Sequence, residues 1–271
     1  MRIAFVNDGI IVCGGLITNY EYVSRLRKLG YEADIYANYS KDNRLRDFYD
    51  ITPKPIEELA NFTDEDLIVA NWWMQVPKLE NYKGRKVQFI QGKDIHFYDG
   101  SLKQKCLEIR HRKNWEMMAV SSYALGWTER QGTIIPNGIH ERFFVNHGLE
   151  RDIDALVEGT PEFNKNVQHS INEAKKDGHK RIVWLGRETK NIPGIETITN
   201  PPIEEIPKIY QRAKHFYKHS LSEGFCLPIL EAKASGCIIH THDMGNNFPE
   251  DADPKDYTWE KAVNKFIKTY L

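Results

Sequence analysis

The sequence predicts an α/β protein made of two halves, each a parallel sheet covered by helices. Three observations support this fold class. Short apolar segments alternate with helical segments up to about residue 135, the alternation stops between Asn146 and Lys180, and it restarts at Arg181. Short apolar strands separated by helices are typical of parallel sheets with both faces buried.

Apolar segments predict the strands and helices of each half. In the first half, strands are expected at Arg2–Asn7, Ala33–Tyr36, Asp66–Ala70, Lys86–Ile90, Glu116–Ser121 and Thr133–Ile135, and helices at Thr18–Leu29 and Leu102–Arg112. Gly30 suits the C-terminal cap of the first helix, because glycine adopts the left-handed conformation that such caps need. The long charged stretch between Asn146 and Lys180 has only scattered apolar residues, so no regular element is predicted there.

The second half repeats the alternation. Strands are expected at Arg181–Leu185, His215–Lys218 and Cys237–His240, and helices at Ile206–Ala213 and Leu227–Ser235. The segment Trp259–Tyr270 places its apolar residues on one face of a closing helix. We therefore predict two Rossmann-like domains, residues 1–138 and 139–255, with residues 256–271 returning to the first domain.

Composition excludes several classes of protein. Hydrophobic residues make up 41% of the 271 residues, which is enough for real cores, and Lys+Arg at 37 nearly balances Asp+Glu at 38. A net charge of −1 disfavours nucleic-acid binding by bulk charge, and no stretch of ~18 apolar residues is present to cross a membrane. The four cysteines form no C-x-x-C pair, which favours a reduced, cytoplasmic protein over a disulfide framework or a zinc site.

Two glycines, Gly14 and Gly15, lie between the first expected strand and the first expected helix. Backbone amides of such a loop can approach an anion, and the helix N-terminus adds partial positive charge. A tight turn explains the same two glycines equally well, because the full G-x-G-x-x-G pattern is absent.

The segment from Ser222 to Cys237 carries two carboxylates with seven residues between them, Glu223 and Glu231. Leu227 and Pro228 open a helix there, since proline is tolerated at the first helical positions. Glu223 is then expected in the loop before the helix and Glu231 about one turn inside it. Both would face a ligand at the carboxyl edge of a parallel sheet. Free amides around Cys226–Pro228 would suit a phosphate, although a loop and helix with two surface glutamates is the alternative.

This segment resembles the E-x7-E region of retaining GT-B glycosyltransferases of the "group 1" type. The positions that match the family's usual pattern are Ser220, Glu223, Gly224, Phe225, Leu227, Pro228, Leu230, Glu231, Ala232, Ala234 and Gly236. Cys226 stands where the family has glycine and Lys233 where it has methionine.

Further matches follow in the family's order along the chain. Gly14-Gly15 resembles its N-terminal glycine loop, Ile135–Ile139 its I-P-N-G-V segment, and Gly186-Arg187 with Lys190 its G-R…K element. The stretch from Arg187 to Glu223 is shorter than usual, so the resemblance implies an abbreviated donor domain.

The resemblance implies two domains facing each other across a cleft, with the acceptor bound by the first and a nucleotide-diphosphate sugar by the second. Arg187 and Lys190 would stabilise the leaving phosphate, and Glu223 would hold the donor sugar. The remaining donor-binding residues would be Glu231 at the ribose, Gly14, Gly15, Cys226, Leu227, Pro228 and Asn137. Transfer would proceed with retention, with no cofactor and no metal. The Asp-x-Asp runs at Asp152–Asp154 and Asp251–Asp253 fall in charged, loop-like stretches.

Candidates for the acceptor side follow expected strands of the first half. They are Asp94, His96 and Trp72. Residues 83–113 hold nine Lys/Arg against three Asp/Glu, which would attract an anionic acceptor such as a glycan or a lipid-linked molecule, or a membrane surface in a peripheral position. A solvated helix face explains the same charges. A nucleotide-binding or sugar-binding module without catalysis, and a nucleotide-sugar epimerase, remain the alternative functions.

Overall fold

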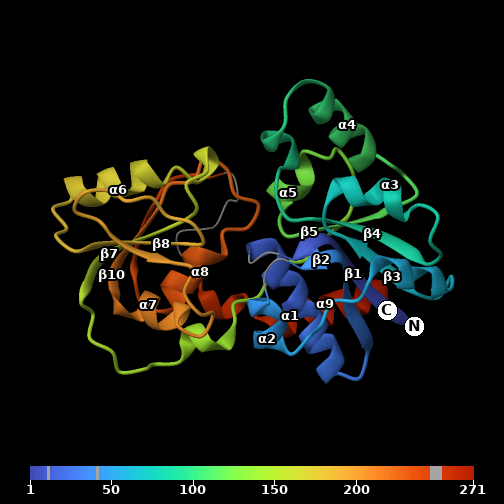
Figure 1. Ribbon diagram of the computed structural model, residues 1–271, viewed down its shortest axis with the longest axis horizontal. Coiled ribbons are helices and arrows are strands. Elements are labelled where there is room, and N and C mark those ends of the chain that lie inside the picture. The colour runs from blue at the N-terminus through green and yellow to red at the C-terminus, as the bar shows by residue number, and fades with distance from the viewer. Residues whose placement is uncertain (11–12, 41–42, 245–251) are drawn as a thin grey trace. The chain divides into compact units, whose positions relative to one another are not determined.

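The chain forms two compact units in a computed structural model (Figure 1) that describes residues 1–10, 13–40, 43–244 and 252–271. Unit 1 consists of Met1–Gly138 and Trp259–Leu271, and unit 2 consists of Ile139–Thr258. Both contain a parallel sheet with helices on its faces, so the predicted α/β class is confirmed.

The sheet of unit 1 has the strand order β2-β1-β3-β4-β5-β6. The bounds of these strands are β1 Arg2–Ile10, β2 Glu32–Ser40, β3 Leu67–Ala70, β4 Arg85–Ile90, β5 Glu116–Ala119 and β6 Thr133–Ile134. Every neighbouring pair is parallel, and in the centre Phe5 lies opposite both Ile35 and Val69. The central strands are apolar on both faces because helices cover both.

Alternate residues of β1 pack against different helices. Ala4 and Val6 belong to a core cluster with α3 (Val76–Leu79) and α4 (Gly100–Arg110). Phe5 points to the opposite face, where its ring lies 5.5 Å from that of Tyr22 on α1 (Gly14–Lys28). The short helices α2 (Arg44–Tyr49) and α5 (Ser122–Gly126) complete the unit.

The last helix, α9 (Trp259–Tyr270), belongs to unit 1 although it follows unit 2 in sequence. The Phe266 ring lies 5.7 Å from Phe5 and 5.3 Å from Tyr22, and the Trp259 ring lies 5.3 Å from Tyr22. The Tyr270 hydroxyl donates to the Met117 carbonyl at 3.1 Å. The predicted return of this helix to the first domain is therefore confirmed.

Unit 2 has the strand order β11-β10-β7-β8-β9, again parallel. Its strands are β7 Ile153–Glu158, β8 Ile182–Gly186, β9 Glu196–Thr199, β10 Ala213–Lys218 and β11 Ile238–Thr241. Helix α6 (Val167–Lys176) covers one face, and α7 (Ile206–Arg212) and α8 (Leu227–Ala234) cover the other (Figure 1). Two separate core clusters fill the two faces.

The stretch between Asn146 and Lys180 differs from the prediction, because it contains the central strand β7 and helix α6. The prediction was wrong here because acidic residues interrupt the apolar pattern of this stretch. Asp152 precedes the strand and binds Arg181 and Arg212, while Asp154 lies near its amino end and binds Lys214 at 2.8 Å. Asp154 therefore lies in a strand, and Asp251 lies outside the described residues. The second sheet starts one strand earlier than expected.

Two further observations concern the described residues of both units. The four cysteines, all of which are described, form no disulfide. Within the described residues, no helix has both the length and the apolar character needed to cross a bilayer.

Candidate functional site

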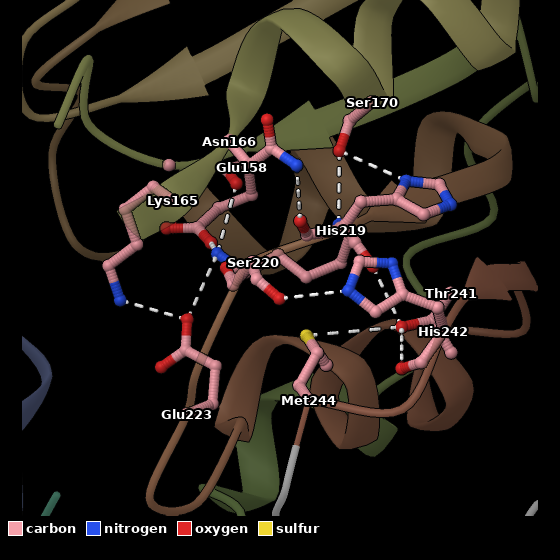
Figure 2. A network of polar contacts seen from close by, with 12 residues as sticks. Glu158, Lys165, Asn166, Ser170, His219, Ser220, Glu223, Thr241, His242 and Met244 are labelled. Carbon is pink, nitrogen blue, oxygen red and sulfur yellow. Dashed lines mark hydrogen bonds and ion pairs between the residues drawn. The ribbon is translucent and has the colours of Figure 1, made fainter. Parts of the chain in front are cut away.

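Charged side chains gather where three strands of unit 2 end. Strand β7 ends at Glu158, β8 is followed by Arg187, and β10 ends at Lys218. Because β10, β7 and β8 are adjacent and parallel, their carboxyl ends lie at one edge of the sheet, the usual ligand position in this type of fold. The loops after β7 and β10 add Lys165 and Glu223, and Figure 2 shows how the side chains of these two residues meet.

Glu223 lies in the loop before α8 and is nearly buried, with 13% of its side chain exposed. Its Oε1 accepts a hydrogen bond from Lys165 Nζ at 2.9 Å and lies 3.8 Å from Lys218 Nζ. Burial alone raises the pKa of Glu223, but the two ammonium groups lower it more, so the net shift is downward. Glu223 is therefore an ionised carboxylate at neutral pH.

Lys218 is a buried cation beneath this carboxylate, with 2% of its side chain exposed. Its ammonium donates to Glu158 Oε2 at 2.6 Å and to the Glu158 carbonyl at 3.0 Å. Burial lowers the pKa of Lys218, but the charges of Glu158 and Glu223 outweigh it, so the net shift is upward. A buried ammonium has to be paired in this way to remain charged.

Arg187 and Lys190 follow β8. Arg187 is partly exposed, and its nearest carboxylates are Glu162 at 3.9 Å and Glu188 at 3.6 Å, both too long for hydrogen bonds. Its Nε is buried and makes no hydrogen bond to any described residue. Glu162 lies in the segment that leads from β7 to Lys165, so Arg187 faces the same loop as the Lys165–Glu223 pair. Lys190 is exposed in the loop that follows.

Glycines allow the ends of β7 and β8 to approach each other closely. A Cβ at Gly186 would lie 2.4 Å from the Gly159 carbonyl oxygen, which no side chain can do. Trp184 Nε1 donates to the same carbonyl at 2.8 Å. The backbone before Arg187 is therefore held firmly against the loop after β7.

Helix α8 begins at Leu227 and carries Glu231, which is partly buried. Burial raises the pKa of the Tyr210 hydroxyl on α7, and Glu231 is among the acidic groups that add to this effect. Burial also raises the pKa of the Cys226 thiol, so it is inert at neutral pH. The Leu227 amide donates to the Phe225 carbonyl at 2.9 Å, and Pro228 has no N–H. The expected free amides are therefore absent at these two positions.

The donor-side candidates of the first half lie in unit 1. The Gly14 carbonyl accepts from Thr18 Oγ1 at 3.0 Å, and Thr18 Oγ1 accepts from Asn137 Nδ2 at 3.2 Å. The Gly15 carbonyl accepts from Gln91 Nε2 at 3.1 Å. The glycines thus open α1 directly, and the buried Asn137 is tied to the start of that helix.

The acceptor-side candidates have different surroundings. Asp94 is buried, and its carboxylate is bound by the fully buried guanidinium of Arg110, with Nε at 2.9 Å. His96 is exposed, and its pKa is lowered by its partial burial and by the charges of Lys93 and Lys103. Trp72 is partly exposed with its ring 6.2 Å from that of Tyr98.

Several cations of the 83–113 segment are neutralised by carboxylates. Besides the buried Arg110, Arg85 pairs with Glu116 at 2.9 Å and Arg112 with Glu80 at 2.6 Å. The other six cations are partly or fully exposed: Lys83, Lys86, Lys93, Lys103, Lys105 and Lys113. The positive surface of this segment is therefore smaller than its composition indicates.

Sequence reasoning missed Lys165, Lys218 and Glu158. Lys165 and Glu158 fall in the stretch where no element was predicted. The signal was present, because Val167, Ile171 and Ala174 follow the spacing of an amphipathic helix and Gly159 precedes it, with a positive φ of 152°. Within the described residues, no group of three or more His, Cys, Asp or Glu side chains is arranged to hold a metal ion.

Known structures resemble the whole chain. HepE from Anabaena, solved with UDP-glucose, is 12% identical and superposes with a TM-score of 0.74. The match covers 100% of this chain and 92% of the HepE chain. Sucrose-phosphate synthase from Thermosynechococcus elongatus is 12% identical, covers 99% and 90%, and gives a TM-score of 0.69. The chain has the GT-B fold.

The GT-B fold is also that of WaaG, a glycosyltransferase involved in lipopolysaccharide biosynthesis. WaaG is 12% identical, covers 98% of this chain and 90% of its own, and gives a TM-score of 0.64. No protein-family model and no curated protein matches the sequence. The likeness is therefore one of architecture, and it covers both units of the chain.

Proposed function

We propose that this protein is a glycosyltransferase that moves a sugar from a nucleotide-diphosphate sugar to an acceptor hydroxyl, with retention and without an essential metal. The observation that carries the proposal is the Lys165–Glu223 ion pair at the carboxyl edge of the unit 2 sheet. In this pair, Lys165 would bind phosphate, and Glu223, in the loop before α8, would bind the sugar. The neighbouring structure of HepE contains UDP-glucose, which supports a nucleotide sugar as the ligand.

The cations would act on the leaving diphosphate. Charge builds on that group as the glycosidic bond breaks, and preorganised cations stabilise it in the transition state. Arg187, which has no tight carboxylate partner among the described residues, suits a bidentate contact with phosphate oxygens, while Lys165 and Lys190 act as point charges. The acceptor proton would pass to the leaving phosphate on the face of the departing bond, which gives retention.

The carboxylates would hold the neutral part of the donor. Glu223 would accept hydrogen bonds from donor-sugar hydroxyls, and Glu231 from the ribose hydroxyls. Cys226, Leu227 and Pro228 would shape the start of α8 around the phosphate, and Gly14, Gly15 and Asn137 would contribute from unit 1. No cofactor is required by this chemistry.

The acceptor would be bound by unit 1. His96 and Trp72 are the exposed or partly exposed candidates there, and Asp94 would act through its buried pair with Arg110. The exposed lysines of the 83–113 segment would favour an anionic or lipid-linked acceptor. We propose a cytoplasmic protein that can lie peripherally at a membrane surface.

A thermal-shift screen against UDP-, GDP-, ADP- and dTDP-sugars tests donor binding, because a ligand that binds the folded state raises its stability. Glu231→Ala should weaken binding of the identified donor by about 1.5–3 kcal/mol, which raises its Kd roughly tenfold to a hundredfold. Glu204→Ala, at an exposed glutamate of the same unit, should leave the affinity unchanged. Equal affinity in the Glu231 variant would reject the ribose assignment.

Product stereochemistry tests the mechanism separately. With a confirmed donor, the anomeric configuration of the product is read by NMR, and turnover is measured with and without EDTA. An inverted product, or turnover abolished by EDTA and restored by a divalent cation, would reject the proposed mechanism. Donor binding without turnover of any acceptor or of water would favour a binding module.

A further inference from the structure

The proposed mechanism assigns no role to one buried charge, the ammonium of Lys218. Two of its three N–H groups are engaged by Glu158, through the carboxylate at 2.6 Å and the carbonyl at 3.0 Å. The third side of the ammonium faces Glu223, whose Oε1 is 3.8 Å away. Lys218 therefore lies between two carboxylates, one from β7 and one from the loop before α8.

The two lysines that flank Glu223 differ in freedom of movement. The Lys165 side chain is 27% exposed and comes from a one-turn 3₁₀ helix, Phe163–Lys165. Lys218 is 2% exposed and ends a strand paired on both sides, by β7 and β11. A donor diphosphate offers more negative charge and more acceptor oxygens than one carboxylate does, so it competes for Lys165. Lys218 is buried and already paired with Glu158, so it is less available to the diphosphate than Lys165 is.

We propose that Lys218 is a positioning residue, the fixed counter-charge that keeps Glu223 ionised and oriented toward the donor sugar when Lys165 turns to the donor phosphate. This inference rests on the proposed function. Without Lys218, the departure of Lys165 would leave a nearly buried carboxylate unpaired, and such a group takes up a proton. A protonated Glu223 would lose the charge that strengthens its hydrogen bonds to sugar hydroxyls.

The other groups around this pair do not supply the same charge. Cys226, before α8, is neutral because burial raises the pKa of its thiol. On the β11 side, His242 hydrogen-bonds the Ser220 carbonyl at 3.1 Å, and the Met244 carbonyl accepts from the Glu223 amide at 3.1 Å. Glu158 adds negative charge, which opposes ionisation of Glu223. Among the described groups in contact with Glu223, Lys165 and Lys218 are thus the cations that favour its ionised form.

Carboxyl titration by NMR tests the inference without any donor. Lys165→Met imitates the state in which Lys165 is engaged elsewhere, and Glu223 should remain ionised at neutral pH in this variant. Adding Lys218→Met and Glu158→Gln removes the buried pair together, so that no unpaired buried charge is left to unfold the protein. In this triple variant the pKa of Glu223 should rise by about 1–3 units above that of Lys165→Met.

One control variant and one check of folding make the outcome decisive. The control variant, Lys165→Met/Glu158→Gln, keeps Lys218, and in it the pKa of Glu223 should not rise above that of Lys165→Met. Equal Glu223 pKa values in the triple variant and in Lys165→Met would overturn the inference, provided that circular dichroism shows both to be folded.

A pH profile separates this inference from the proposed function. In Lys218→Met/Glu158→Gln, the acid limb of kcat, which reports the complex with bound donor, should move up by about 1–3 pH units while kcat at high pH is retained. An acid limb that does not move, in an enzyme that turns over its donor, would overturn the role of Lys218. A wild-type protein that binds no nucleotide sugar would instead overturn the proposed function, whatever the titration of Glu223 shows.

Discussion

Arginine side chains at the two ends of β8 have opposite surroundings. Arg181, before the strand, binds the carboxylates of Asp152 and Glu196, the latter at 3.0 Å. Arg187, after the strand, has carboxylates no nearer than 3.6 and 3.9 Å among the described residues. A cation at the ligand edge without a tight partner is suited to an incoming anion, whereas one that is already paired serves the fold.

We expect Arg187→Ala to lower turnover by roughly 10²–10³-fold, because it removes one preorganised donor to the leaving phosphate. Arg181→Ala, at the opposite end of the same strand, is the matched control and should change kcat little. Steady-state kinetics with the identified donor compares them. Full turnover in Arg187→Ala, or an equal loss in both variants, would contradict the assignment.

His219 is a buried imidazole that the fold keeps neutral. Burial and the neighbouring His169 and His242 lower the pKa of His219 to about 4, from its ordinary value of 6.5. A lowered histidine pKa stabilises the fold fully above pH 6.5, and this contribution is lost as the pH falls from about 6.5 to about 4. Protonation in the unfolded chain drives the loss.

Between pH 7 and pH 5, we expect His219→Gln to lose about 2 kcal/mol less of its free energy of unfolding than the wild type loses. Urea denaturation at the two pH values measures both losses. His215 and His240, whose pKa values are also lowered, remain in the variant, so some acid destabilisation should persist. An identical loss in both proteins would show that His219 is not the group responsible.

At the scale of elements, helix α9 supplies much of the aromatic packing on one face of the unit 1 sheet. Trp259, Phe266 and Tyr270 are each at most 1% exposed. The rings of Trp259 and Phe266 contact Tyr22 of the first helix, and Phe266 also contacts Phe5 of the first strand. The Tyr270 ring packs against Phe266. Unit 1 therefore depends on a helix whose sequence lies beyond the whole of unit 2.

Trp259→Ala should lower the free energy of unfolding by about 3–5 kcal/mol, the usual cost of removing a large buried aromatic side chain. Lys268→Ala, at an exposed position of the same helix, should change it by less than about 0.5 kcal/mol. Chemical denaturation measures both values. A small effect at Trp259 would mean that α9 is not integral to unit 1.

The elements that the sequence predicts best are those with a clear apolar period. The bounds of α9 agree with the prediction because Trp259, Val263, Phe266 and Tyr270 mark one face of the helix. Strand β7 was missed because Asp152 and Asp154 flank its start, where they bind basic side chains of neighbouring strands at the amino edge of the sheet. The identity of those partners depends on strand order, which local sequence does not contain.

The same reason limits prediction of the site. Glu223 was identified from a continuous run of residues, and the structure places it at the expected sheet edge. Lys165 approaches it only because β10 lies next to β7, and this contact joins residues 58 positions apart along the chain. The pair of Lys218 with Glu158 likewise joins residues 60 positions apart. Asp94 was expected beside a ligand, but Arg110, sixteen residues later, binds it in the core.

At the scale of the whole molecule, the two units differ in continuity. Unit 2 is one continuous segment, Ile139–Thr258, whereas unit 1 is assembled from Met1–Gly138 and Trp259–Leu271. Unit 2 also has its own core clusters on both faces of its sheet. Apart from those of Gly14, Gly15 and Asn137, the proposed contacts with the donor come from this continuous segment.

We expect residues 139–258, expressed alone, to fold and to bind the nucleotide sugar without turning it over. Residues 1–138 alone should lack a fixed tertiary structure, since they expose the surface that α9 covers. Near-UV circular dichroism and calorimetric titration test the two fragments. A folded fragment 139–258 that binds no nucleotide would place essential donor contacts in unit 1.

The position of α9 also has a consequence for biosynthesis. A ribosome completes the polypeptide of unit 2 before it reaches Trp259, and domains generally fold as units once their sequence has emerged. Unit 1, although its first strand is made first, must wait for α9 to cover Phe5 and Tyr22. The nascent chain therefore exposes an aromatic surface throughout the synthesis of its second half, which is the surface that a chaperone would bind.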